Sequence, residues 1–196
     1  MNNKTKTSMI LSTTAITMLA VIFTPGAAFA DHTPWYGGPI LPNGDAQFWF
    51  HCTSLDTMSV DGDRTNNCNK VKTEVQQSMS TYNNLGNSID LTTSSSFVDY
   101  IVYATDLGAF GDSAQATFPN ETGDYVRYND WRDFGTSGSC NLWYAYNLEW
   151  LTNHEFGHTV GLAHAADGEN SVMVDNCASS WSTVQSHDDA VLDNKY

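Results

Sequence analysis

Basic residues are scarce in this sequence. Lysine and arginine together number 8 against 22 aspartates and glutamates, and the formal net charge is −14. Proteins that bind nucleic acid use basic patches to neutralise phosphates, so we expect no nucleic-acid partner. The acidity suits solubility, cation binding or a salty medium, and charge alone does not choose among these.

A second long hydrophobic run is also lacking. The one apolar stretch, residues 9–23, follows Lys4 and Lys6 and leads into small residues that include Ala28 and Ala30. A basic start, an apolar stretch and an A-x-A end are typical of a secretory signal peptide. An uncleaved anchor is the alternative, but the run is short for a membrane span.

We therefore predict a signal peptide over residues 1–30 and one secreted, extracellular domain over residues 31–196. Its length suits a single hydrophobic core. The domain would carry 6 basic and 22 acidic residues, because Lys4 and Lys6 are lost with the signal peptide. We expect a monomer with no stable membrane insertion after cleavage. Residues 31–45 are rich in proline and glycine and predict an extended N-terminal arm.

Cysteine is used only four times, at Cys52, Cys68, Cys140 and Cys177. An even count in an exported chain indicates two disulfides. Three pairings are open, and we favour Cys52–Cys68 with Cys140–Cys177, since the second pair would bracket the segment that carries the chemistry. A cysteine zinc site is the alternative, but the usual C-x-x-C spacing is missing.

Hydrophobic periodicity predicts alternating strands and helices along the rest of the chain. Strands are expected at residues 47–52, 97–103, 112–118 and 125–128, a loop at 131–139, and helices at 70–82, 141–160 and 186–195. Ser186 is the expected N-cap of the last helix. This order fits the α+β class, a small sheet packed on two long helices with an irregular lower part that ends in a C-terminal helix.

The segment from His154 to His164 reads H-E-x-x-H-x-x-G-x-x-H. On a helix, His154 and His158 lie one turn apart on one face and can share a metal ion. Glu155 is placed to reach a metal-activated water as general base without binding the metal. Gly161 allows the helix to end in a sharp turn that returns His164 as a third ligand. Three imidazoles with an open fourth position suit catalytic Zn²⁺.

This pattern resembles the metzincin zinc metallopeptidases, and within them the matrix-metalloproteinase-like (matrixin-like) branch. The resemblance implies a small twisted mixed sheet and a methionine turn beneath the metal, for which Met173 is the candidate. It also implies an edge strand near residues 114–118 that holds an extended peptide substrate, and a specificity pocket walled by residues 174–181. Asp175 stands where astacins and serralysins have a tyrosine, so no tyrosine ligand is expected. Family enzymes often bind Ca²⁺, and the acidity agrees with this, although no ligands match residue by residue.

The predicted function is that of a secreted zinc-dependent endopeptidase acting on protein or peptide substrates. Two alternatives stay open. One is a catalytically silent zinc-binding or adhesion module, although such proteins usually lose the glutamate that is present here as Glu155. The other is a secreted zinc hydrolase of non-peptide amides, which a substrate panel would separate.

Overall fold

The computed structural model describes residues 40–96, 99–119, 123–136, 146–166, 169–174 and 182–196. All of them belong to one compact unit, Asp31–Tyr196. The predicted signal peptide and nearly all of the predicted N-terminal arm lie outside the described residues. The cleavage site after Ala30 therefore stays a prediction.

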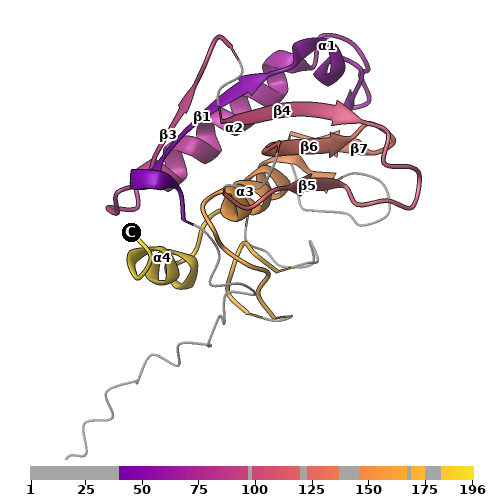
Figure 1. The fold of residues 1–196 in the computed structure, drawn as a ribbon. Coiled ribbons are helices and arrows are strands. Elements are labelled where there is room, and N and C mark those ends of the chain that lie inside the picture. Colours follow the sequence, from indigo (N-terminus) through magenta and orange to yellow (C-terminus); the bar gives the residue numbers. More distant parts are fainter. Residues whose placement is uncertain (1–39, 97–98, 120–122, 137–145, 167–168, 175–181) are drawn as a thin grey trace, which may run out of the picture. The chain divides into compact units, whose positions relative to one another are not determined.

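A five-stranded sheet forms the centre of this unit, with its strands side by side in the order β3-β1-β4-β6-β5 (Figure 1). β5 runs antiparallel to β6, and the other neighbouring pairs are parallel. The sheet is thus mixed, and the predicted α+β class is confirmed. The strands are β1 (Asp45–Phe50), β3 (Asp90–Thr93), β4 (Tyr100–Thr105), β5 (Ala114–Ala116) and β6 (Tyr125–Asn129).

Two long helices pack together on one face of this sheet, α2 (Cys68–Asn83) and α3 (Leu148–Thr159). The helix predicted over residues 70–82 is confirmed as α2, and its apolar stripe at helical spacing, Val71, Val75, Met79 and Tyr82, is buried. Burying each valine contributes about 1.5–3 kcal/mol. None of the helices in the described ranges has both the length and the apolar character that crossing a bilayer requires.

The core between sheet and helices is aromatic. The ring of Phe48 on β1 stacks at 4.8 Å on Tyr100 of β4 and at 4.8 Å on Phe156 of α3. All three side chains are fully or almost fully buried. Offset stacking adds about 0.5–1.5 kcal/mol per pair beyond area burial, so the ring of Phe48 ties the central helix to the middle of the sheet.

Several short elements escape the sequence patterns. They are η1 (Pro42–Gly44), α1 (Cys52–Leu55), β2 (Ser59–Val60), β7 (Asp133–Gly135) and β8 (Tyr146–Asn147). β2, β7 and β8 form a second sheet in the order β2-β7-β8. The prediction that residues 131–139 form a loop is therefore wrong for Asp133–Gly135. A strand of two or three residues shows too little alternation of apolar and polar residues to be recognised. β3 is longer, but the sequence analysis missed it because only Leu91 of its four residues is buried.

The predicted helix over residues 141–160 is shorter than expected at its start. Tyr146 and Asn147 form β8, and the helix begins at Leu148. The side chain of Asn147 accepts a hydrogen bond from the backbone N–H of Trp150 at 2.8 Å. Asparagine is among the best N-cap residues, so Asn147 fixes the start of the helix. Residues 141–145 lie outside the described part.

The last helix, α4, spans Ser186–Asp193. Ser186 is not its N-cap, so that prediction is wrong. The N-cap is Gln185, whose backbone N–H donates to the carboxylate of Asp188 at 2.9 Å, while its side chain accepts from the backbone of Asp188. Glutamine is a poor N-cap by propensity, and the reciprocal capping box with Asp188 overrides that preference.

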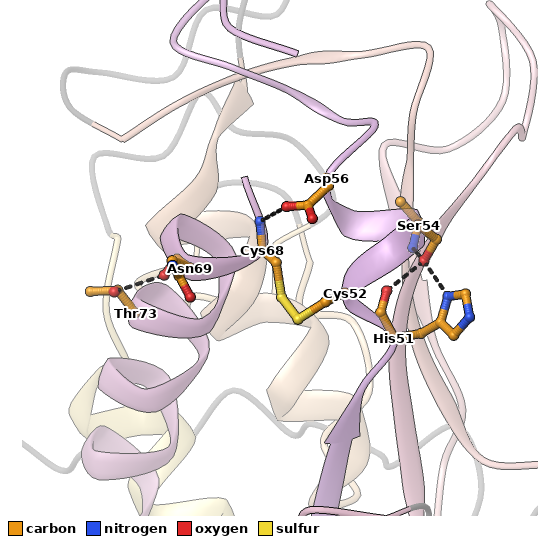
Figure 2. The surroundings of a disulfide bond; sticks show 8 residues. His51, Cys52, Ser54, Asp56, Cys68, Asn69 and Thr73 are labelled. Atoms are coloured by element: carbon orange, nitrogen blue, oxygen red, sulfur yellow. Dashed lines mark hydrogen bonds between the residues drawn. A yellow bond between two sulfur atoms is a disulfide. The ribbon is translucent and has the colours of Figure 1, made fainter. Parts of the chain in front are cut away.

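Cys52 and Cys68 form a disulfide that joins the start of α1 to the start of α2 (Figure 2). The backbone N–H of Cys68 also donates to the carboxylate of Asp56 at 2.8 Å. The bond closes a loop with a sequence separation of 16, which is worth about 3 kcal/mol in the chain-entropy account. Cys140 and Cys177 lie outside the described residues, so their pairing stays a prediction.

Candidate metal centre

The centre is built on α3, the most buried helix of the molecule. Every residue from Leu148 to Thr159 is buried except Glu149, which lies in the first turn. An acidic side chain in the first turn of a helix is stabilised by the helix dipole. The helix is packed on nearly all sides, and His154 and His158 lie one turn apart on it.

The end of α3 is a Schellman motif. The backbone N–H of Leu162 donates to the carbonyl of Gly157 at 2.8 Å, and the N–H of Gly161 donates to the carbonyl of His158 at 2.9 Å. Gly161 takes the left-handed conformation that this motif requires, with φ of 86°. The predicted role of Gly161 in turning the chain is thus supported by its geometry. The turn carries the chain back toward His164.

Three imidazoles converge at this point. One ring nitrogen from each of His154, His158 and His164 lies within 4.8 Å of the other two. The ring centroids are 5.0 Å apart for His154 and His158, 5.1 Å for His154 and His164, and 4.7 Å for His158 and His164. Within the described ranges, this is the one group of three or more histidine, cysteine or acidic side chains close enough to share an ion.

Two of the rings are held in one tautomer by backbone carbonyls. Nδ1 of His154 donates to the carbonyl of Val172 at 3.0 Å, and Nδ1 of His158 donates to the carbonyl of Leu162 at 2.8 Å. A neutral imidazole that donates through Nδ1 keeps a lone pair on Nε2. Backbone partners of this kind orient the ligands of metal sites and raise their basicity.

Burial also keeps these rings uncharged. It lowers the pKa of His154 well below the usual value, and neighbouring His158 and His164 lower it further. Burial lowers the pKa of His158 to about 4, with a further contribution from His164. A metal ion needs the neutral imidazole, and both side chains provide it at neutral pH without having to lose a proton.

These residues fit a zinc ion. Zn–N distances of about 2.0–2.1 Å in a tetrahedron place two ligand nitrogens about 3.3 Å apart. Nε2 of His158 and Nε2 of His164 lie 3.0 Å apart. Because His158 donates through Nδ1, its Nε2 presents a lone pair toward His164, and a shared cation satisfies both rings. Three nitrogen donors leave a fourth position for a water or a substrate oxygen.

Glu155 lies directly beside the histidines and is 4% exposed. Burial, together with a smaller contribution from the negative charge of Asp112, raises the pKa of its carboxyl group to about 8. Asp112 lies two residues before the edge strand β5. A proton acceptor with a pKa near the working pH is what general base catalysis favours.

Met173 is fully buried and lies against Gly157 in the last turn of the metal-binding helix. An added Cβ on Gly157 would lie only 2.2 Å from the sulfur of Met173 and 3.0 Å from the hydroxyl of Tyr82. Any side chain at position 157 would therefore require the Met173 side chain to move. The family resemblance pointed to Met173, but nothing local in the sequence marks Gly157 as its partner.

Asp188 is a further residue that the sequence patterns did not reveal. This fully buried carboxylate accepts a hydrogen bond from the hydroxyl of Ser171 and one of 3.0 Å from the backbone N–H of Val172. The carbonyl of Val172 in turn holds His154. In the sequence, Asp188 stands out only as an acidic residue in the first turn of the last helix, and that position does not show what the side chain contacts.

A second buried network supports α3 from α2. Asn153 precedes the first histidine and accepts from the hydroxyl of Ser78 at 2.6 Å through its side chain. Its backbone carbonyl accepts from the hydroxyl of Tyr82 at 2.7 Å, and its amide group donates to the carbonyl of Ser182 at 2.7 Å. Buried polar groups that are fully satisfied rigidify the surrounding structure. The network fixes the position of the metal-binding helix along its axis and its rotation about that axis.

The edge of the sheet borders the centre. β5 pairs with β6, and its other edge has no partner strand among the described residues. Phe118, just beyond β5, makes an edge-to-face contact with His158 at 5.4 Å. An open edge beside the three histidines offers backbone groups to an extended peptide. Of the expected specificity wall at residues 174–181, only Val174 is described, and it pairs with Ala165.

The fold and the site define an α+β protein with a three-histidine centre of the metallopeptidase kind. The sequence model of the matrixin family matches residues 102–195, a range that includes α3, all three histidines and α4. This match supports a matrixin-like metzincin, and the family points to a zinc-dependent peptidase. No curated protein gave a significant match to the chain.

Proposed function

We propose that this protein is an exported zinc-dependent endopeptidase in which Glu155 is the general base. His154, His158 and His164 would hold the zinc ion. The observation that carries the proposal is the convergence of these three rings within 4.8 Å, next to a buried carboxylate. The match to the matrixin family supports the same reaction class.

Zinc bound here would supply a Lewis acid that lowers the pKa of a water molecule and polarises the scissile carbonyl. Glu155 takes the proton of the attacking water and later delivers it to the leaving amine. In the metal-free protein its pKa is raised to about 8, so it accepts a proton more readily than an exposed glutamate does. The open edge of β5 binds the substrate as an added strand and holds its scissile bond over the centre.

The roles of the site residues are tested with Glu155→Gln. This variant keeps the volume and the buried position of the side chain but cannot accept the proton. We expect zinc content close to wild type and at least a 100-fold loss of casein hydrolysis, in line with the usual contribution of a general base. Glu149→Gln, in the first turn of the same helix, is the matched control and should keep full activity.

Two results would contradict the proposal. Casein cleavage by Glu155→Gln at near the wild-type rate would remove the general base from this position. A wild-type protein that binds zinc but cleaves no peptide, with or without added chelator, would instead favour a silent zinc-binding module. Cleavage of non-peptide amides, without cleavage of peptides, would instead indicate a zinc hydrolase of non-peptide amides.

We also propose that residues 1–30 direct export and that the mature protein begins at Asp31. The Cys52–Cys68 disulfide supports this, because disulfides form in oxidising compartments outside the cytosol. Mass spectrometry of the protein recovered from the culture medium should show an N-terminus at Asp31. Protein found only in the membrane fraction with residues 1–30 attached would contradict the proposal.

A further inference from the structure

A pocket of about 360 Å³ lies on the opposite face of the main sheet from the helices. His51, Ile101, Tyr103, Gly123 and Tyr125 line it. Strand alternation explains its position, because Val102 and Val126 are buried toward the helices while Ile101, Tyr103 and Tyr125 point the other way. The metal centre lies on the helix side of the sheet, so this pocket is separate from it.

Two tyrosine rings form one corner of the pocket. Tyr125 on β6 pairs with Ile101 on β4, and its ring meets that of Tyr103 at 6.1 Å with an interplanar angle of 74°. The guanidinium of Arg127 lies 4.6 Å from the centre of the Tyr125 ring, and its Nε donates to the side chain of Gln115 at 2.8 Å. These contacts hold the Tyr125 ring in place before any ligand arrives.

His51 forms the third wall, at the end of β1 (Figure 2). The hydroxyl of Ser54 donates its only proton to the carbonyl of His51 at 2.9 Å and accepts from the backbone N–H of Ala104 at 3.1 Å. Nδ1 of His51 lies 2.9 Å from the same hydroxyl oxygen and must therefore be the donor. In the neutral ring, Nε2 is left as a hydrogen-bond acceptor with no protein partner among the described residues.

The chemistry of this lining selects a neutral ligand with both an apolar face and hydroxyl groups. Among the described residues, no carboxylate, lysine or arginine lines the pocket. Arg127 already occupies one face of Tyr125, so a second cation is disfavoured. The strongly negative chain also repels acidic ligands. Aromatic faces with a few polar groups at their rims, such as phenol hydroxyls and an imidazole acceptor, are the usual make-up of a small-molecule site.

We propose that this pocket binds one neutral hexopyranose unit of a saccharide. The C–H face of the sugar ring packs on Tyr103 and Tyr125, and one of its hydroxyls donates to Nε2 of His51. The volume of about 360 Å³ accommodates a pyranose ring with its substituents. The protein would thus combine its metal centre with a separate glycan-binding surface on the other side of the sheet.

The test measures binding of the purified protein to four neutral trisaccharides, namely maltotriose, cellotriose, chitotriose and mannotriose, by saturation-transfer NMR and calorimetry. We expect at least one to bind with millimolar affinity or better. Tyr103→Ala should weaken that binding at least tenfold, and His51→Phe, which keeps an aromatic wall but removes the acceptor, should weaken it about fivefold. Zinc content should be unchanged in both variants.

Trp131→Leu is the control, because Trp131 is another exposed aromatic residue and does not line the pocket. It should bind the saccharide as wild type does. Failure of all four trisaccharides to bind would overturn the proposal, as would equal binding by Tyr103→Ala and wild type. Tighter binding of tetramethylammonium than of any saccharide would assign the pocket to cations instead. None of these readouts requires peptidase activity.

Discussion

The carbonyl oxygen of Val172 lies 3.0 Å from Nδ1 of His154, although the two residues are 18 positions apart in the sequence. Asp188, on the C-terminal helix, binds the N–H of the same residue, Val172. The peptide unit of Val172 is therefore held between a buried carboxylate and a metal ligand. A helix at the end of the chain thereby sets the orientation of the first histidine.

Replacing Asp188 by asparagine should loosen this connection. The asparagine amide keeps one acceptor oxygen, but its NH₂ group faces a hydrogen-bond donor where the aspartate offered a second acceptor oxygen. Each hydrogen bond to the charged carboxylate is worth about 1.5–3 kcal/mol, and at least one is lost. We expect a loss of about 2–4 kcal/mol in the free energy of unfolding and 10–100-fold weaker zinc binding, as for other residues that orient ligands. Asp193→Asn, on an exposed position of the same helix, is the control for calorimetry and zinc titration. Unchanged zinc affinity in Asp188→Asn would show that Val172 needs no help from α4.

Gly157→Ala should introduce a steric conflict beneath the metal. The new Cβ would lie 2.2 Å from the sulfur of Met173. Overpacking costs about 1–3 kcal/mol, and alanine returns about 1 kcal/mol of helix propensity. We expect a net loss of stability and weaker zinc binding, because His158 adjoins the displaced residue.

The double variant Gly157→Ala with Met173→Ala tests the cause of that loss. Truncating Met173 removes the atom that clashes, so the two substitutions should together cost less than the sum of their separate effects. A coupling of about 1 kcal/mol or more in thermal unfolding is expected for residues in contact. Strict additivity would mean that Met173 is not what excludes a side chain at position 157.

The metal-free protein should lose stability in acid between pH about 6.5 and 4. The pKa of His158 is about 4 in the folded chain, below the usual value of 6.5, so the unfolded chain binds more protons in this window. The neutral His158 contributes about 3 kcal/mol to the free energy of unfolding. This contribution is fully present above pH 6.5 and is lost as the pH falls to 4. His154 adds a contribution of the same sign, because its pKa is also lowered.

Glu155 works in the opposite direction, because its pKa is raised to about 8 and it stabilises the fold most at low pH. The pH series is therefore measured by chemical denaturation of chelator-treated Glu155→Gln protein. His158→Gln in the same background should flatten the slope between pH 6.5 and 4. An unchanged slope would show that His158 is charged in the folded metal-free protein.

Removing the disulfide should affect stability and leave the chemistry intact. Cys52 and Cys68 join α1 to α2, and the three histidines lie on and after α3. Replacing both cysteines by serine should cost about 3 kcal/mol for a loop of this length. Calorimetry should show the lower melting temperature, while zinc content and casein hydrolysis at 25 °C should stay within twofold of wild type. A loss of zinc would show that α1 and α2 hold the centre together.

The sequence alone determined the features that depend on local spacing. Ligands four residues apart must share a helix face, a glycine after them permits the left-handed turn at Gly161, and the apolar stripe of α2 must face a core. The α+β class, three of the four described α-helices and four of the eight described strands followed from the same periodicities. Very short strands such as β7 did not, because two or three residues carry no recognisable period.

Only the tertiary structure decided which distant groups support the centre. Asp188, Gly157 and Asn153 are ordinary residues in the sequence, and each acts through a partner that folding brings from another element. The pocket beside His51 is likewise assembled from three strands that lie far apart in the chain. Such contacts depend on the mutual placement of whole elements, which is set by packing of the shared core and leaves no periodic signal in the sequence.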